Sequence, residues 1–492
     1  MDDKKRPVNS GEIQAVFGNS YDYDAREILI GGAGGKVKAT VCYIDGRVSG
    51  DAVAREIIRP ATESSRFANV ELESQAIDMF LEGLVYSYTA RLRTDMESVV
   101  DDLMNGFCAV IFDSAGACVS FEVRTDVKRS IDEPKDEKVV KGSKDVFIEI
   151  LKMNTMQVRR KLRNSDLRFK EMEIGEKTKT MVVVAYIENY TNMEIVKEME
   201  KRLLSAHIES AITASSIEEA LYDRPRSMFP QLVRTERPDR FCMNLLEGRV
   251  GLLIDGLPMG YLAPGSFSQC FHVPDDNAHQ YIVASVFAIL RYIAVIAALV
   301  LPAAYIAIVM YHPEMLPTRL LLSIIKSRQA VPFPSAVEVL TMLAALELLQ
   351  EAGLRLPNSI GGTMSIIGAL VVGQSAVEAK IVSPAVVVVI AISGVSAYTV
   401  PNQDMSNALR VYRFLLVIAA IAAGMFGVVL GFAGIIYHLC TLESFGVSYM
   451  EPFAGGVKSK SSRGIIRLPV SKTREMDPLL KPRSKGEKGN EK

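Results

Sequence analysis

The feature that most constrains this chain is a change of solvent near Tyr281. Charged, soluble-looking sequence over residues 1–280 gives way to long apolar runs over residues 281–450, and a basic tail follows. A membrane-spanning helix needs roughly 20 consecutive, mostly apolar residues, and soluble domains rarely supply several such runs in succession. The sequence therefore predicts an integral membrane protein with a large water-soluble head.

Four apolar stretches are long enough to span a bilayer. They cover residues 281–311, 359–377, 381–400 and 411–439. A fifth stretch, near residues 331–350, carries two prolines and the carboxylates of Glu338 and Glu347. Because lipid-facing helices disfavour such residues, the fifth stretch is predicted to be re-entrant or buried in protein. The predicted transmembrane helical domain, residues 281–450, thus has about four spans.

Charge is divided along the chain in a way that the overall balance of −1 conceals. Residues 1–280 carry a net charge of about −8, whereas residues 281–492 carry about +7, nearly all of it in the tail over 451–492. The positive-inside bias assigns such a tail to the cytoplasm. The charged start of the chain lacks the apolar segment of a signal peptide. Both head and tail are therefore predicted to be cytoplasmic, which requires an even number of spans.

Within the head, a strand-like run that ends in an acidic turn occurs twice. Each run, 41–46 and 184–189, precedes a helical pattern and a second strand, 106–113 and 248–256. The matched acidic residues are 68 positions apart in the first copy and 67 in the second. This agreement predicts an internal duplication. The predicted fold is an α/β soluble head of two similar subdomains, 1–127 and 146–280, joined by a charged linker at 128–145 and followed by an α-helical transmembrane bundle.

Few side chains of the head indicate a chemical site. The glycine-rich run 31–36 resembles a phosphate-binding loop, but Ile30 replaces the first glycine and Val37 follows the lysine, which favours a turn between strands. A solvated connector explains His272 and His279, which flank an acidic pair, better than a metal site does. The six cysteines lack C-x-x-C spacing and are predicted to be free thiols. We expect no catalytic residue, cofactor, metal or nucleic-acid partner, and the sequence disfavours an enzyme.

One predicted helix carries a stripe that would suit the wall of a pore. At 100° per residue, one arc of about 100° contains Ser359, Thr363, Ile367, Leu370, Gln374 and Glu378. In a ring of identical helices, the two apolar residues would form a hydrophobic constriction and Glu378 an acidic ring that favours cations. The candidate pore-lining residues are Thr363, Ile367, Leu370, Gln374 and Glu378. The alternative is a packed helix with polar ends at the membrane surface.

Arg291 lies ten residues into the first apolar stretch. Its side chain either extends to the head groups at the membrane surface or pairs with an intramembrane carboxylate, for which Glu338 and Glu347 are the candidates. Both interpretations remain open at the level of sequence.

Ordered motifs over residues 130–450 carry a family resemblance. They read D-E-P at 132–134, V-V-K-G-S-K-D-V-F-I-E at 139–149, F-P-Q at 229–231, T-E-R-P-D at 235–239, L-E-G-R-V at 246–250, V-P-F-P at 331–334 and E-A-G-L-R-L-P at 351–357. In these motifs the chain resembles the A subunits of spore germination receptors, the GerA family. Stage V sporulation protein AF shares this architecture, and the sequence does not separate the two.

The resemblance implies a protein of the inner membrane of bacterial spores that takes part in nutrient sensing. It implies a transporter-like B subunit and a lipoprotein C subunit as partners, and A subunits that assemble into an ion-conducting ring. A gated ion channel subunit is therefore the predicted function. The alternative is a membrane scaffold that organises the receptor subunits without conducting ions. A secondary transporter is disfavoured because the membrane half shows no repeat of broken helices.

Overall fold

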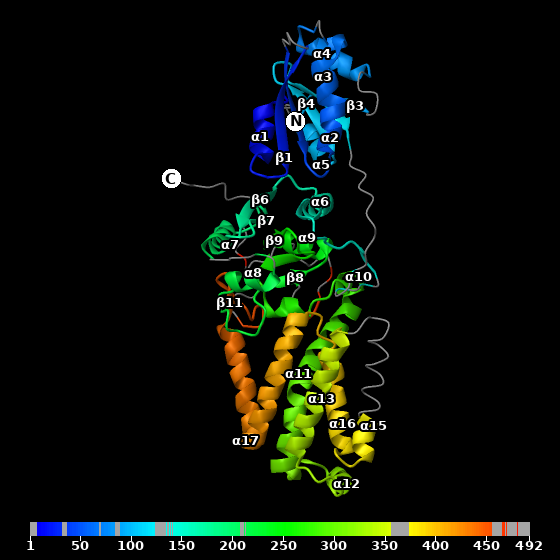
Figure 1. Ribbon diagram of the computed structural model, residues 1–492, viewed down its shortest axis with the longest axis vertical. Coiled ribbons are helices and arrows are strands. Elements are labelled where there is room, and N and C mark those ends of the chain that lie inside the picture. Colours follow the sequence, from blue (N-terminus) through cyan, green and yellow to red (C-terminus); the bar gives the residue numbers. More distant parts are fainter. Residues whose placement is uncertain are drawn as a thin grey trace. The chain divides into compact units, whose positions relative to one another are not determined.

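The computed structural model describes residues 7–31, 37–67, 70–83, 89–123, 134, 137, 139, 141–206, 211, 213–355, 373–454, 465–467, 469 and 480. They divide into two compact units (Figure 1). The first contains the described residues up to Tyr222, Leu232–Pro264 and Leu480. The second contains Asp223–Gln231 together with the described residues of 265–473.

The first lobe of the first unit, residues 7–123, is built around a five-stranded antiparallel sheet. Its strands are β1 (Tyr23–Ile30), β2 (Val37–Ile44), β3 (Ala90–Arg93), β4 (Phe107–Phe112) and β5 (Ala117–Glu122). Its helices are α1 (Ser10–Phe17), α2 (Gly50–Ala52), α3 (Arg59–Glu63), α4 (Glu73–Leu81) and α5 (Met96–Met104), with a π-helical turn over Val53–Ile58. Every residue of β4 is buried, as expected of a short, wholly apolar strand inside a core.

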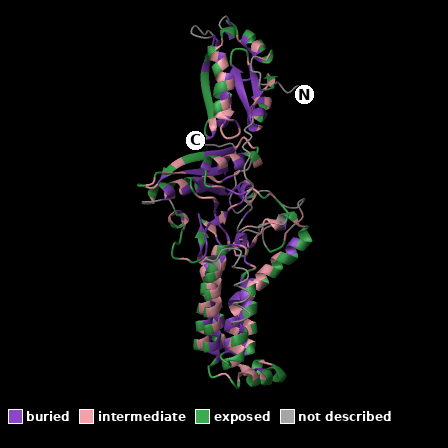
Figure 2. Ribbon diagram, turned by 45° about the vertical axis from the view of Figure 1, so that its right-hand side comes forward, coloured by how far each residue is buried: buried purple, intermediate pink, exposed green. Residues whose placement is uncertain are grey.

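The second lobe, residues 141–222 and 232–264, repeats this arrangement. Its strands are β6 (Leu167–Ile174), β7 (Thr180–Ile187), β8 (Val233–Thr235), β9 (Val250–Ile254) and β10 (Gly260–Ala263). Its helices are α6 (Leu151–Lys161), α7 (Met193–Ser205), α8 (Ala214–Leu221) and α9 (Pro238–Leu246). Figure 2 shows buried residues along the strands of both sheets.

The strand order confirms the predicted duplication. It is β1-β2-β4-β5-β3 in the first lobe and β6-β7-β9-β10-β8 in the second, so equivalent strands occupy equivalent places. The runs matched in the sequence are β2 with β7 and β4 with β9. Residues 32–36 of the glycine-rich run lie outside the described residues. The strands that flank them pair antiparallel from Ile30 and Val37, as the predicted turn requires.

A buried ion pair joins the two lobes. Arg159 of α6 donates from Nε and one terminal nitrogen to the two carboxylate oxygens of Asp22, each at 2.8 Å. The same guanidinium reaches the Ser20 hydroxyl at 3.0 Å and lies 4.9 Å from the centre of the Phe169 ring. The side chains of Arg159 and Asp22 are only 1% and 6% exposed. The contact therefore fixes the start of β1 against the second lobe.

The second unit is a helical bundle. Its helices are α10 (Asp275–Ala278), α11 (Tyr281–Tyr311), α12 (Thr318–Arg328), α13 (Ser335–Arg355), α15 (Gly373–Glu378), α16 (Pro384–Ala397) and α17 (Gln403–Thr441). By length and composition, α11 and α17 could each cross a membrane. The fifth apolar stretch of the sequence forms α13, whose Val339 and Leu343 are fully buried. Figure 2 shows exposed residues along the outer faces of the helices.

The last apolar stretch, predicted as one span over 411–439, is a helical hairpin. The backbone of α17 leaves the helical conformation at Ala423 and Gly424. A Cβ added to Gly431 would lie 2.7 Å from the Leu416 side chain. In a straight helix these two residues would be on the order of 20 Å apart. Figure 1 shows the two legs of α17 meeting at this turn and diverging away from it. Each leg has a length of roughly 25–30 Å, close to the thickness of the hydrocarbon core.

Gly424 should be essential to this hairpin. Its φ of +58° and ψ of −138° are reached almost exclusively by glycine, and an added Cβ would lie 2.9 Å from Tyr311. We expect Gly424→Ala to destabilise the purified protein by about 1–3 kcal/mol, measured as a lower thermal midpoint in detergent. Gly434→Ala is the matched control, since an added Cβ there meets no atom within 4 Å. Equal midpoints for the two variants would contradict this role.

Three segments pack at one end of the bundle. They are Asp223–Gln231, the start of the unit at Gly265–Phe271, and the residues that follow α17, including the short strands β11 (Glu443–Ser444) and β12 (Val447–Ser448). The Ser444 hydroxyl donates to the carbonyl of Gln231 at 2.7 Å and accepts the amide of Gly265 at 3.1 Å. The Phe229 ring stacks on Tyr412 at 4.8 Å and lies 6.0 Å from His438, so it touches both legs of α17.

Candidate functional site

A cluster of three charged side chains lies inside the helical bundle. Glu347 of α13 accepts from Arg410 at 2.6 Å and also pairs with Arg413, both from the first leg of α17. The Arg413 side chain is 1% exposed, whereas Glu347 and Arg410 are 20% and 17% exposed. One carboxylate therefore bridges two guanidinium groups within apolar helices. Such charges are costly inside a membrane protein and are retained where they have a role.

The cluster extends to two further helices through a proline. Pro302 lies inside α11 and has no N–H group, so the carbonyl of Ala298 lacks its usual helical donor. The Ser393 hydroxyl of α16 donates to this carbonyl at 2.8 Å. Arg413 in turn donates to the Ser393 hydroxyl at 3.3 Å. The helices α11, α13, α16 and α17 are thereby joined in one hydrogen-bonded network, which we call the central network.

Glu338 has separate partners nearer the start of α13. Its side chain is fully buried and pairs with Arg328 of α12 at 3.3 Å. Its other oxygen accepts the backbone N–H of Ser383 at 2.7 Å, at the start of α16. This carboxylate thus ties three helices together and satisfies a donor that the start of α16 leaves free.

Arg291 pairs with a residue that the sequence did not suggest. Its guanidinium contacts the carboxylate of Asp276 in α10, so it is directed toward the beginning of α11. Neither Glu338 nor Glu347 is its partner. The interpretation in which the side chain extends toward the membrane surface is the one that this geometry favours. Arg467 from the tail lies at the same place, where it donates to the carbonyls of Asp276 and His279.

Most of the predicted pore stripe lies outside the described residues, including Ser359, Thr363, Ile367 and Leu370. The two described members are in α15, where the Gln374 amide donates to the Glu378 carboxylate at 3.0 Å. Both side chains are exposed. All six cysteines are free thiols, as predicted, and burial raises the pKa of Cys42 and Cys242 to about 12.

The central network is suited to hold one arrangement of the helices and to oppose another. Arg413 is almost fully buried, so a relative movement of α13 and α17 must break or exchange an ion pair. Sequence reasoning identified Glu347 but assigned no role to Arg410, Arg413 or Ser393. The two arginines are spaced i, i+3 and so share one helix face. This pair of arginines at the start of the apolar stretch 411–439 is the sequence signal for the cluster.

Comparison with known proteins gives a consistent result. Residues 11–478 match the family described as Bacillus/Clostridium GerA spore germination protein. Spore germination protein B1 of Bacillus subtilis is 36% identical, over 88% of this chain and 89% of its own. Spore germination protein KA of Bacillus subtilis is 34% identical, over 95% and 86%.

Among solved structures, the N-terminal domain of the A subunit of the Bacillus megaterium spore germinant receptor GerK3 is similar to this chain. It is 27% identical, with 54% of this chain and 97% of that chain covered and a TM-score of 0.42. The family match covers both the α/β head and the helical bundle. This chain therefore belongs to the GerA family of spore germination proteins.

Proposed function

We propose that this protein is the A subunit of a spore germinant receptor and that copies of it form a ring that conducts ions when germination is triggered. The observation that carries the proposal is the central network, in which Arg413 is almost fully buried against Glu347. Charged groups inside membrane helices are expensive and mark ion pathways and switching elements. A shift between two arrangements of these helices would open and close the conducting path.

In this proposal the pore is lined by Thr363, Ile367, Leu370, Gln374 and Glu378. The exposure of Gln374 and Glu378 supports the assignment, because side chains on a pore wall are not covered by their own chain. Ile367 and Leu370 would form the hydrophobic constriction, which closes by excluding water. The acidic groups of Glu378 would favour cations over anions.

The partners that we propose are a transporter-like B subunit and a lipoprotein C subunit, within the inner membrane of the spore. The head and the tail would both face the cytoplasm. Support comes from Arg467, whose backbone N–H donates to the Ser285 hydroxyl at 3.0 Å. Arg467 of the tail therefore lies at the end of the bundle where α11 begins. The chain enters the bundle from the head at the start of α11, and the tail lies at the same end. This arrangement fits an even number of membrane crossings.

Spores that carry Leu370→Ala should leak. Removing the larger apolar side chain would widen and wet the constriction, so we expect monovalent cations to leave these spores without any nutrient. The measurement is cation release from dormant spores by flame photometry. Val429→Ala is the matched control, because Val429 is 61% exposed on the second leg of α17, which follows Gly424. Release at the wild-type level from Leu370→Ala spores with normal amounts of the protein would contradict the proposed pore lining and favour a scaffold.

A further inference from the structure

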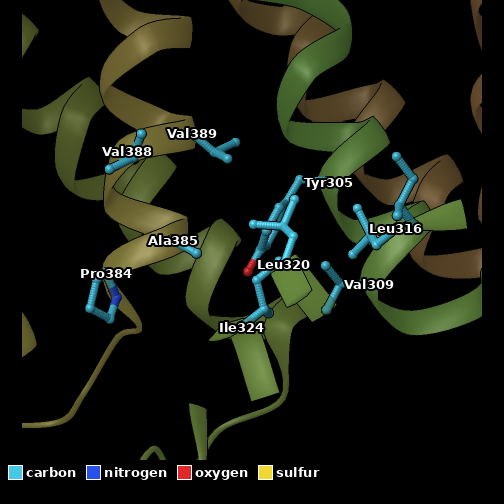
Figure 3. A pocket seen from close by; sticks show the side chains of 10 residues that line it. Tyr305, Val309, Leu316, Leu320, Ile324, Pro384, Ala385, Val388 and Val389 are labelled. Atoms are coloured by element: carbon cyan, nitrogen blue, oxygen red, sulfur yellow. The ribbon is translucent and has the colours of Figure 1, made fainter. Parts of the chain in front are cut away.

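An apolar groove opens where α11 ends. It has a volume of about 410 Å³ and lies between α11, α12 and α16 (Figure 3). Its lining consists of Tyr305, Ile308, Val309, Leu316, Leu320, Ile324, Pro384, Ala385, Val388 and Val389. The helix α11 has 31 residues, so the groove lies roughly 40 Å along the helix from Tyr281. This distance is enough to cross the hydrocarbon core. The groove is thus placed near the second membrane surface.

The helix that forms one wall of the groove has two faces. Leu320 and Ile324 of α12 line the groove, and Leu322 and Ile325 are exposed apolar residues. Arg319 and Lys326 are both exposed and lie within about 20° of each other around the helix axis. A short helix with an apolar face and a basic face is typical of a segment that lies in the membrane surface and attracts anionic lipids.

Polar groups are buried beside the groove. Tyr305 of α11 is 9% exposed, and its hydroxyl lies beside the hydroxyl of Ser383, which is fully buried immediately before Pro384. The two hydroxyls therefore satisfy each other at the contact between α11 and α16, as buried hydroxyls usually find a partner. The groove itself is lined almost wholly by apolar side chains, which suits a hydrocarbon chain.

We propose that this groove binds an acyl chain of an anionic phospholipid. The acyl chain lies along the apolar lining, and the phosphate lies beside Arg319 and Lys326. The basic face of α12 favours a lipid of negative charge over a zwitterionic one. The bound lipid would lie between α12 and α16, the two helices that Glu338 ties together. It would therefore adjust how these helices pack. This site does not depend on whether the protein conducts ions.

The absence of tryptophan from the chain allows a direct test. Leu320→Trp places one fluorophore at the groove, and Phe426→Trp places one on the second leg of α17, where Phe426 is 71% exposed. Each full-length protein is reconstituted in phosphatidylcholine vesicles that contain brominated phosphatidylglycerol or brominated phosphatidylcholine as quencher. For Leu320→Trp, we expect half-quenching to need a roughly tenfold lower fraction of brominated phosphatidylglycerol than of brominated phosphatidylcholine. For Phe426→Trp, we expect the two lipids to quench at equal fractions.

Two further variants assign the preference to this site. Adding Arg319→Gln and Lys326→Gln to Leu320→Trp should abolish the preference for brominated phosphatidylglycerol, whereas Lys201→Gln in the head should leave it unchanged. Val388→Trp, on the opposite wall, provides a second reporter. Equal quenching by the two lipids at both reporters would overturn the proposal. Protection of both reporters from both lipids would also overturn it, because a second protein surface would then cover the groove.

Discussion

Replacing Glu347 with glutamine is expected to destabilise the protein by about 3–5 kcal/mol, the usual cost of breaking a buried ion pair by removing one partner. The substitution leaves the guanidinium groups of Arg410 and Arg413 facing each other without a balancing carboxylate. Arg413 has no route to water, since only 1% of its side chain is exposed. The measurement is the thermal midpoint of the purified full-length protein in detergent.

Two controls separate loss of the charge pair from general damage to α13. Glu351→Gln changes an exposed carboxylate one turn further along the same helix and should shift the midpoint little. The triple variant Glu347→Leu with Arg410→Met and Arg413→Met should recover much of the stability, because apolar residues of similar volume replace buried ion pairs well. If Glu347→Gln were as stable as Glu351→Gln, the central network would not hold the bundle together.

Replacing Arg159 with methionine should have a comparable effect on the head. Methionine keeps much of the side-chain volume but leaves the carboxylate of Asp22 buried without its cation, at an expected cost of about 3–5 kcal/mol. The Ser20 hydroxyl still donates to Asp22 at 2.6 Å, which compensates only part of the charge. Chemical denaturation followed by far-UV circular dichroism would report the change in the free energy of unfolding.

The neighbouring arginine supplies the matched control. Arg160 is 55% exposed and pairs with Asp145 at 3.3 Å on the surface. Exposed pairs of this kind contribute about 0–1 kcal/mol, so Arg160→Met should leave the unfolding free energy almost unchanged. A similar loss of stability in both variants would mean that the buried contact between the lobes has no special weight.

The sequence predicted the head well because a duplicated pattern provides an internal check. The runs that became β2 and β7, and those that became β4 and β9, matched in order and spacing before any fold was known. Strand alternation and turn residues are local signals. The ion pair between Arg159 and Asp22 joins residues 137 positions apart, and no local pattern records such a contact.

The membrane half was predicted less completely, for a physical reason. Hydropathy reports how apolar a segment is, and it has the same value for one long helix and for two helices folded back on each other. The turn of α17 lies at Ala423 and Gly424, two small residues among many, and only Gly424 has a positive φ. The partners of Arg291 and Glu347 were likewise missed, because pairing inside a bundle depends on which helix faces meet.

Ion flux through the purified protein tests the proposed function most directly. The full-length chain and its Leu370→Ala variant would be reconstituted separately in liposomes, and cation release would be followed with a fluorescent indicator. We predict little flux from the wild type and clearly faster flux from Leu370→Ala. Absence of flux from both proteins, once each is shown to be oligomeric and correctly inserted, would contradict the proposed pore and would leave a scaffold as the better account.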